Sequence, residues 1–108
     1  MVSKIGEITE DEVALIAVAV GAERHDGIAS YSALRKEVPK RYRLSAMDLQ
    51  QSITRPREKI WEQKIRNIKS HFESEGNFIY EGYLVHVPRV GYRITDKGRR
   101  LVRRHEAA

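Results

Sequence analysis

Residues 55–76 read RPREKIWEQKIRNIKSHFESEG, and this stretch decides the fold. Its apolar residues return every three or four positions, so they stack on one side of an α-helix. These residues are Ile60, Trp61, Ile65, Ile68 and Phe72. The opposite side is polar and basic. The pattern predicts a helix over 55–76 that packs on a small core with one face and presents the other to a partner.

The chain has 108 residues, which is the size of one domain. It contains no cysteine, so a disulfide framework and thiolate metal sites are excluded. His25, His86 and His105 have no partner at metal-ligand spacing, and we expect neither a metal nor a cofactor. The longest apolar run, 13–20, is too short to cross a bilayer, and acidic residues precede it. We therefore expect a cytoplasmic protein without membrane contact.

Charge is distributed unevenly along the chain. The formal net charge is +5, and residues 35–66 alone carry ten basic and four acidic side chains. Clustered Lys and Arg attract polyanions, and nucleic acid is the commonest such partner of a small basic domain. The alternative is a basic surface that only contacts solvent.

Capping residues and turn residues divide the rest of the chain into elements. Thr9 and Glu12 form a capping box before an apolar helix, and Ser30 caps a second helix that Pro39 is expected to stop. A brief strand lies at 27–29. Seven segments are predicted: an N-terminal arm at 1–8, a first helix at 9–22, a second at 30–38, a short one at 45–53, the long helix at 55–76, a β-wing at 78–95 and a C-terminal helix at 96–104.

Details within these segments are also predicted. Ser45 caps the short helix, which buries Leu44, Met47 and Ile53, and Pro56 occupies the first turn of the long helix. Gly82 interrupts the first arm of the hairpin, whose tip is basic. Gly98 weakens the last helix.

This order of elements is that of a winged helix-turn-helix domain. We therefore predict a single α+β domain over 1–108, with a helical core and a small antiparallel β-wing. Helix 55–76 is then the recognition helix, which lies in the major groove of double-stranded DNA.

Two segments, 61–76 and 91–99, resemble a particular family. An aromatic-Glu-polar-basic-aliphatic run opens the first, WEQKIR, and the second reads GYRITDKGR. The chain resembles the winged-helix DNA-recognition domain at the N-terminus of Mrr-type, modification-dependent restriction endonucleases. The resemblance implies a specificity domain or subunit that reads modified bases, commonly modified cytosine. It would be a free-standing recognition module, an excised domain, or a subunit whose nuclease or other effector is a separate chain. In this family the span corresponding to 76–91 is usually shorter.

The DNA-contacting candidates fall into two groups. Base-edge candidates can donate to guanine or pair with adenine; they are Lys59, Gln63, Arg66, Asn67 and Ser70. Candidates for phosphate or groove contact set the register; they are Arg55, Arg57, Lys64, His71 and Arg89. The alternative for all of them is an ordinary solvated helix face. Trp61 lies in the apolar stripe and is assigned to the core rather than to base stacking.

Three other functions remain open. Glu62 and Lys64 match the Glu-x-Lys half of a nuclease signature, with Asp48 upstream, but that signature requires carboxylates on adjacent strands around Mg²⁺. We therefore predict that the chain is not an enzyme and has no catalytic residue.

A free-standing transcriptional regulator is the second alternative. The third is a protein-interaction or homodimeric winged helix, which the very apolar first helix favours through Leu15 and Val18.

Overall fold

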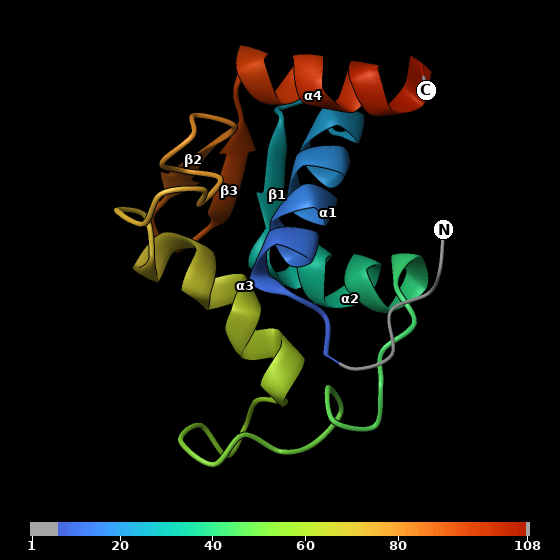
Figure 1. Cartoon of the computed structure of the whole chain (residues 1–108), viewed down its shortest axis with the longest axis vertical. Helices are drawn as coiled ribbons and strands as arrows, with labels where there is room; N and C mark the ends of the chain where they lie inside the picture. Colours follow the sequence, from blue (N-terminus) through green and yellow to red (C-terminus); the bar gives the residue numbers. More distant parts are fainter. Residues whose placement is uncertain (1–6, 108) are drawn as a thin grey trace.

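A computed structural model describes residues 7–107 and shows an α+β fold (Figure 1). Four helices and one three-stranded antiparallel sheet are present in this part of the chain. In order they are α1 (Glu10–Glu23), β1 (Ile28–Ser30), α2 (Tyr31–Arg41), α3 (Ile60–Ser70), β2 (Leu84–Val87), β3 (Gly91–Ile94) and α4 (Asp96–Ala107). Of the predicted arm at 1–8, residues 1–6 lie outside the described range.

The sheet brings together segments that are distant in sequence. Its order is β1-β3-β2, with β3 antiparallel to both neighbours. Gly91 pairs with Ser30 on one side and Val87 on the other. A Cβ at Gly91 would lie 2.2 Å from the Ala29 carbonyl oxygen, so a side chain is sterically excluded there. The predicted strand at 27–29 is confirmed with a shift of one residue.

The core surrounds α1, which contacts α2, α3, α4, β1 and β3. The predicted capping box is present, because Thr9 Oγ1 accepts the Glu12 N–H and the Glu12 carboxylate accepts the Thr9 N–H. The largest fully buried apolar side chains come from several elements: Ile8, Val13, Val18, Val20, Leu34, Val38, Ile68, Leu84 and Tyr92. Ile8 is therefore a core residue, which the prediction of an N-terminal arm at 1–8 did not anticipate.

Pro39 does not stop α2. Ser30 caps this helix as predicted, since its Oγ accepts the Ala33 N–H at 3.0 Å. The helix continues past Pro39 to Arg41, and the Tyr42 N–H closes its end on the Val38 carbonyl at 2.9 Å. Pro39 is exposed and lies in the last turn, where the missing N–H removes only one intrahelical hydrogen bond.

The short helix predicted at 45–53 is absent and is replaced by a turn over 46–49. The predicted cap at Ser45 does form, because Ser45 Oγ accepts the Asp48 N–H and Asp48 accepts the Ser45 N–H. The chain then reverses, and Gln51 forms an antiparallel bridge with Lys59. Met47 and Ile53 are exposed rather than buried, whereas Leu44 does pack against the core.

The long helix is shorter than the predicted range of 55–76 at both ends. Residues 55–58 form a turn closed by the Glu58 N–H on the Arg55 carbonyl, so Pro56 is not in a helix. Lys59 is the N-cap, and its N–H donates to Glu62 at 2.8 Å. At the other end, the buried Asn77 side chain donates to the Ile68 carbonyl at 2.8 Å. Phe72 consequently lies beyond the helix and is 51% exposed.

The β-wing is also shorter than the predicted range of 78–95. Residues 78–83 form turns, because the Asn77 side-chain oxygen accepts the N–H groups of Ile79 and Tyr80. Gly82 has φ +87° and lies in these turns before β2, so the prediction that it interrupts a strand is wrong, because no strand directly precedes it. The hairpin itself consists of β2, a turn at 88–90, and β3.

The C-terminal helix is present and extends three residues beyond its predicted end. Thr95 Oγ1 accepts the Gly98 N–H at 3.0 Å at its start. Leu101 and Val102 are partly buried, while Arg100, Arg103 and Arg104 are exposed. Figure 1 shows α4 across one end of the molecule, with the segment joining α2 to α3 at the opposite end.

Candidate nucleic-acid interface

Helix α3 is fixed in the core by its apolar face. Trp61, Ile65 and Ile68 are buried, with Trp61 only 4% exposed, which confirms its assignment to the core. The Tyr92 hydroxyl of β3 donates to the Ile65 carbonyl at 2.5 Å and accepts the Lys69 N–H at 3.2 Å. Burial raises the pKa of this hydroxyl, which keeps it protonated and able to donate. The position of α3 is therefore set by α1 and the sheet together.

The outer face of α3 is less accessible than its sequence predicts. Of the residues in α3, Ser70 alone is exposed, and Gln63, Arg66 and Asn67 are half-buried. The segment of residues 51–59, called here the 51–59 loop, covers the first turns. Gln63 Nε2 donates to Ser52 Oγ at 2.6 Å and to Thr54 Oγ1 at 3.0 Å. Gln63, one of the base-edge candidates, therefore contacts this loop, and Arg66 contacts it as well.

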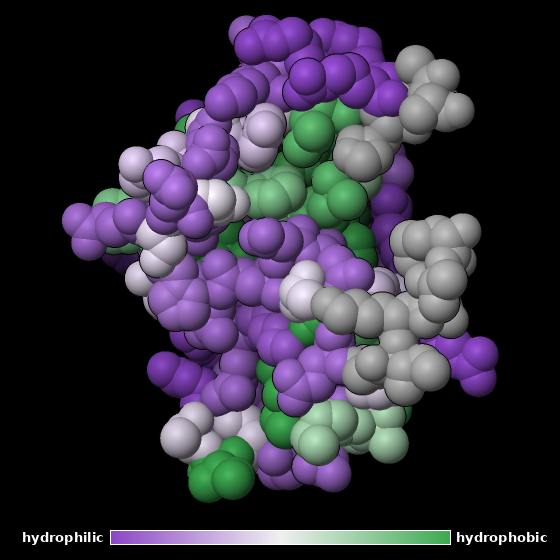
Figure 2. Space-filling model, in the orientation of Figure 1, coloured by the Kyte–Doolittle hydropathy of each residue, from purple (hydrophilic) through white to green (hydrophobic). Residues whose placement is uncertain are grey.

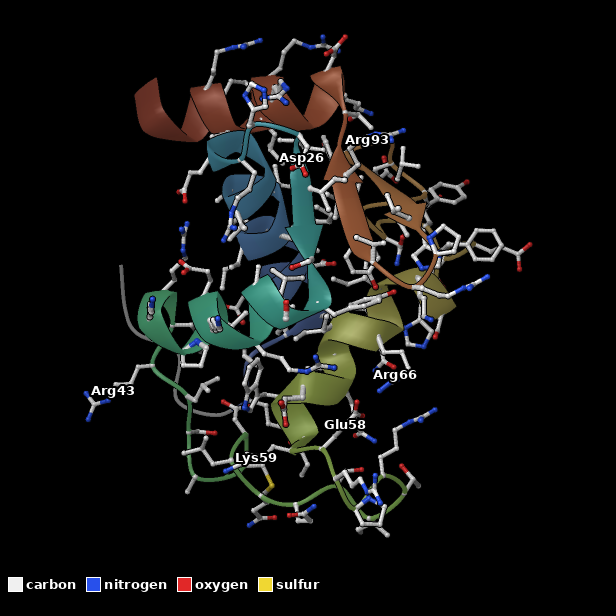
Figure 3. The ribbon with its side chains drawn as sticks, turned by 180° about the vertical axis from the view of Figure 1, so that it is seen from behind. Asp26, Arg43, Glu58, Lys59, Arg66 and Arg93 are labelled. Carbon is white, nitrogen blue, oxygen red and sulfur yellow. The ribbon has the colours of Figure 1, made fainter. Side chains whose placement is uncertain are left out.

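Arg66 forms an ion pair with Glu58 of the 51–59 loop. Figure 3 shows Glu58 and Arg66 on the side of α3 that faces away from α1. The Arg66 side chain is 31% exposed and that of Glu58 14% exposed, so the pair is partly shielded from solvent. Arg66 can reach a base edge only if it exchanges this carboxylate for the nucleic acid.

Lys64 and His71 lie on the flank of α3 that faces the chain's N-terminal part. Lys64 Nζ donates to the Ile8 carbonyl at 2.5 Å and lies 3.5 Å from the Glu7 carboxylate. His71 Nδ1 lies 2.7 Å from Glu10 Oε1, at the start of α1. Both side chains therefore join α3 to α1 and to the residues that precede it.

The other phosphate candidates lie at the two ends of α3. Arg55 and Arg57, together with the base-edge candidate Lys59, are exposed on the 51–59 loop at the N-terminal end. Arg89 is exposed on the β2–β3 turn with φ +67°, and Figure 1 shows this turn beside the C-terminal end of α3. No ion pair involving these four residues is present among the described residues. Two basic projections thus flank the helix.

The remaining base-edge candidates, Asn67 and Ser70, follow Arg66 along α3. Ser70 Oγ donates to the Arg66 carbonyl at 3.3 Å, and its lone pairs and exposed position leave it able to accept from a partner. Asn67 is half-buried. These two residues lie nearest the β2–β3 turn, whereas Lys59 lies at the opposite end.

The structure adds residues that the sequence did not single out. Lys69 and Arg35 line a small groove between α2 and α3, of about 60 Å³. Lys69 Nζ lies 5.9 Å from the centre of the Tyr31 ring, and Arg35 Nε lies 3.8 Å from Glu62. Lys69 follows Arg66 by three positions and so shares its face of the helix, a spacing visible in the sequence. The approach of Arg35 depends on the packing of α2 on α3.

Tyr31 and His86 join the start of α2 to the β2–β3 hairpin. The Tyr31 hydroxyl lies 3.0 Å from His86 Nε2, and the Tyr31 ring packs edge-on against Tyr92. Burial, with a smaller contribution from the Lys69 charge, lowers the pKa of His86. This favours the neutral form of His86, which can hydrogen-bond to Tyr31 without carrying a charge into the β2–β3 hairpin.

The residues of the nuclease signature make structural contacts. Glu62 accepts the Lys59 N–H at the start of α3, and Asp48 accepts the N–H groups of Ile8 and Ser45. Among the side chains that the structure describes, those of residues 7–104, no group of three or more His, Asp or Glu is placed to bind a metal ion. In residues 7–107 no helix is both long and apolar enough to cross a membrane.

Searches against protein-family models, curated proteins and solved structures found no match.

Proposed function

We propose that this chain is a winged helix-turn-helix domain that binds double-stranded DNA. The observation that carries the proposal is the order α1-β1-α2-α3-β2-β3 combined with the sheet order β1-β3-β2. In this arrangement α2 and α3 form the helix-turn-helix unit and the β2–β3 hairpin is the wing. The partly exposed polar face of α3 then lies beside two basic projections.

The dimensions of this surface suit a duplex. With 11 residues, α3 is about 16 Å long, and the major groove is about 12 Å wide. With α3 in that groove, the 51–59 loop and the β2–β3 turn reach the DNA on either side. Arg55, Arg57 and Arg89 then contact phosphates or the adjoining grooves.

Base reading in this proposal divides into two sets. Lys59, Asn67 and Ser70 reach base edges without breaking an ion pair. Gln63 and Arg66 do so by exchanging the side chains of Ser52, Thr54 and Glu58 for DNA, which is a change of side-chain partners within the closed 51–59 loop. Lys64 and His71 contribute by holding α3 against the start of α1 and the residues before it, rather than by touching DNA.

We further propose a role as the specificity domain or subunit of a modification-dependent restriction system. Two segments support it. The run from Trp61 to Arg66 opens α3, and the run from Gly91 to Arg99 forms β3 and the start of α4. These are the positions at which the resembling recognition domains carry their recognition helix and the end of their wing. The proposed target is a modified cytosine.

A titration against plain, methylated and hydroxymethylated duplexes tests both levels of the proposal. We expect binding whose affinity falls steeply with added salt, since each phosphate contact adds about 0.9 to the slope of log affinity against log salt. Tighter binding to a modified duplex supports the restriction role. Equal binding to all three contradicts that role and leaves a general DNA-binding domain. No binding, or no salt dependence, contradicts DNA binding itself.

A second candidate function is self-association through α1. Figure 2 shows hydrophobic side chains over α1 directly beside the hydrophilic row of α4. A groove there is lined by Ala19, Ala22 and Val102 together with Glu23, Arg99 and Arg103. Light scattering after size-exclusion chromatography distinguishes the two states, and a strict monomer contradicts this candidate.

A further inference from the structure

The tip of the 51–59 loop, residues 53–57, combines an exposed apolar side chain with two free arginines. Its sequence is Ile53-Thr54-Arg55-Pro56-Arg57, and all five residues are exposed. Ile53 is 97% exposed, the highest value among the exposed large apolar residues. Figure 2 shows the hydrophobic spot at the lower edge of the molecule, over this loop. Isolated surface apolar residues are common, and what distinguishes Ile53 is that two exposed arginines lie within four residues of it.

Backbone hydrogen bonds close the base of the 51–59 loop, below the tip. The Ser52 N–H donates to the Glu58 carbonyl and the Ile60 N–H to the Gln50 carbonyl, both at 2.9 Å. Ser52 Oγ also accepts the Arg55 N–H at 3.0 Å. Pro56 occupies the second position of the turn over 55–58, where its fixed φ is favourable. The tip is therefore ordered before it meets a partner, which lowers the entropic penalty of binding.

The base of the loop is also joined to α3. Gln63 binds Ser52 and Thr54, and Arg66 pairs with Glu58. The tip consequently has a defined position at the N-terminal end of α3. A helix in the major groove places its flanking segments over the adjoining minor groove, because the two grooves alternate along the duplex.

Resting on the proposed DNA-binding function, we propose that the tip enters the minor groove beside the α3 site. Arg55 and Arg57 lie in the groove, and Ile53 wedges between neighbouring base pairs. The narrow minor groove of A·T-rich DNA concentrates negative potential and attracts arginine. Apolar wedges partly unstack a base step and bend the duplex toward the major groove. Arginine suits this position better than lysine because its guanidinium is more weakly hydrated.

The first test measures DNA bending. The probe is an A·T-rich duplex of about 30 base pairs with a fluorophore at each end, and energy transfer reports the bend. Wild-type protein should bend it by about 20° or more. Ile53→Ala should remove most of the bend, whereas Leu49→Ala should retain it. Leu49 is a matched control because it is 47% exposed but lies outside the tip. Equal bending by wild type and Ile53→Ala overturns the wedge and points to a protein partner for Ile53.

The second test separates groove entry from phosphate contact at Arg57. On the A·T-rich duplex, Arg57→Ala and Arg57→Lys should both lower affinity, by about tenfold for the alanine variant. On a G·C-rich duplex of equal length, Arg57→Lys should bind like wild type. Full rescue by lysine on both duplexes overturns minor-groove entry but leaves DNA binding intact. Failure of the wild type to bind either duplex overturns the proposed function as well.

Discussion

Gly98 illustrates how one residue serves two requirements that oppose each other. Glycine in a helix interior is less stable than alanine by about 1 kcal/mol, so its presence in α4 is unfavourable in isolation. A Cβ at Gly98, however, would lie 2.4 Å from the Tyr83 carbonyl oxygen and 2.8 Å from Ile94 Cγ1. The close packing of α4 on the chain before β2 therefore requires glycine.

We expect Gly98→Ala to destabilise the protein despite its better helix propensity. The steric overlap with the Tyr83 backbone should lower the free energy of unfolding by about 1–3 kcal/mol. Urea denaturation measures the change. Arg100→Ala is the control, because it alters an exposed residue of the same helix and should be nearly neutral. A Gly98→Ala variant as stable as wild type would show that α4 can shift away from Tyr83.

His86 makes stability depend on pH. Its folded-state pKa is lowered by burial and by the charge of Lys69, so the unfolded chain takes up a proton at higher pH than the folded one. Stability should therefore fall as the pH drops below the unfolded value of about 6.5. Denaturation at several pH values should show a smaller loss in His86→Gln, which can still hydrogen-bond to Tyr31. An NMR titration midpoint for His86 at or above 6.5 contradicts this prediction.

At the scale of elements, Asp48 connects the turn at 46–49 to the start of the core. Its side chain is fully buried, and it accepts the Ile8 N–H at 3.0 Å and the Ser45 N–H at 2.9 Å. Through these bonds one carboxylate holds both the residues before α1 and the segment after α2. The predicted helix at 45–53 is replaced by this local turn.

Asp48→Ala should therefore be strongly destabilising. It leaves two backbone N–H groups without an acceptor, which should lower the free energy of unfolding by about 2–4 kcal/mol. Asp48→Asn, which keeps one acceptor oxygen, should lose less. Glu73→Ala is the control, because it removes an exposed carboxylate outside the helices and strands. Urea denaturation measures all three, and equal stability of Asp48→Ala and Glu73→Ala contradicts the connecting role.

On the scale of the whole molecule, basic residues occupy two opposite ends. Arg55, Arg57 and Lys59 lie on the 51–59 loop, whereas the exposed basic row of α4 lies across the other end (Figure 1). If net charge alone drove DNA binding, the two ends would contribute equally. The proposed interface predicts that they do not, since only the loop lies beside α3.

Two triple variants with the same net charge test this difference. One replaces Arg55, Arg57 and Lys59 by Gln, and the other replaces Arg100, Arg103 and Arg104 by Gln; each removes three positive charges and lowers the formal net charge from +5 to +2. Titration with duplex DNA at fixed salt should show a large loss for the loop variant and a small one for the α4 variant. Equal losses contradict the proposed position of the interface.

Local signals predicted several elements correctly. The capping box at Thr9 and Glu12 marked α1, and Ser30 marked α2, because each uses residues a few positions apart. The change to β-forming residues marked the hairpin, although residues 78–83 form turns instead of a strand. The predicted ends of the long helix were wrong. Ser52 and Glu58 form hydrogen bonds with the Arg55 backbone at one end, and Asn77 donates to the Ile68 carbonyl near the other, and the spacing of apolar residues does not report these bonds.

The candidate site could be predicted only in part from such local signals. The sequence identified the polar side chains on the outer face of α3, and helical spacing placed them correctly relative to one another. It could not show that Gln63 and Arg66 contact the 51–59 loop or that Lys64 and His71 contact the residues around the start of α1. Those partners are 8 to 61 positions away, so no local pattern reports them.

By itself, then, the sequence determined the apolar stripe of α3, the caps of α1 and α2 and the basic surplus of the middle segment. These follow from interactions between near neighbours, which the chemistry of each residue and its spacing specify. Tertiary structure alone decided where α3 begins and ends and which of its polar side chains remain available. It did so because buried hydrogen-bonding groups must find partners, and folding brings those partners from distant parts of the chain.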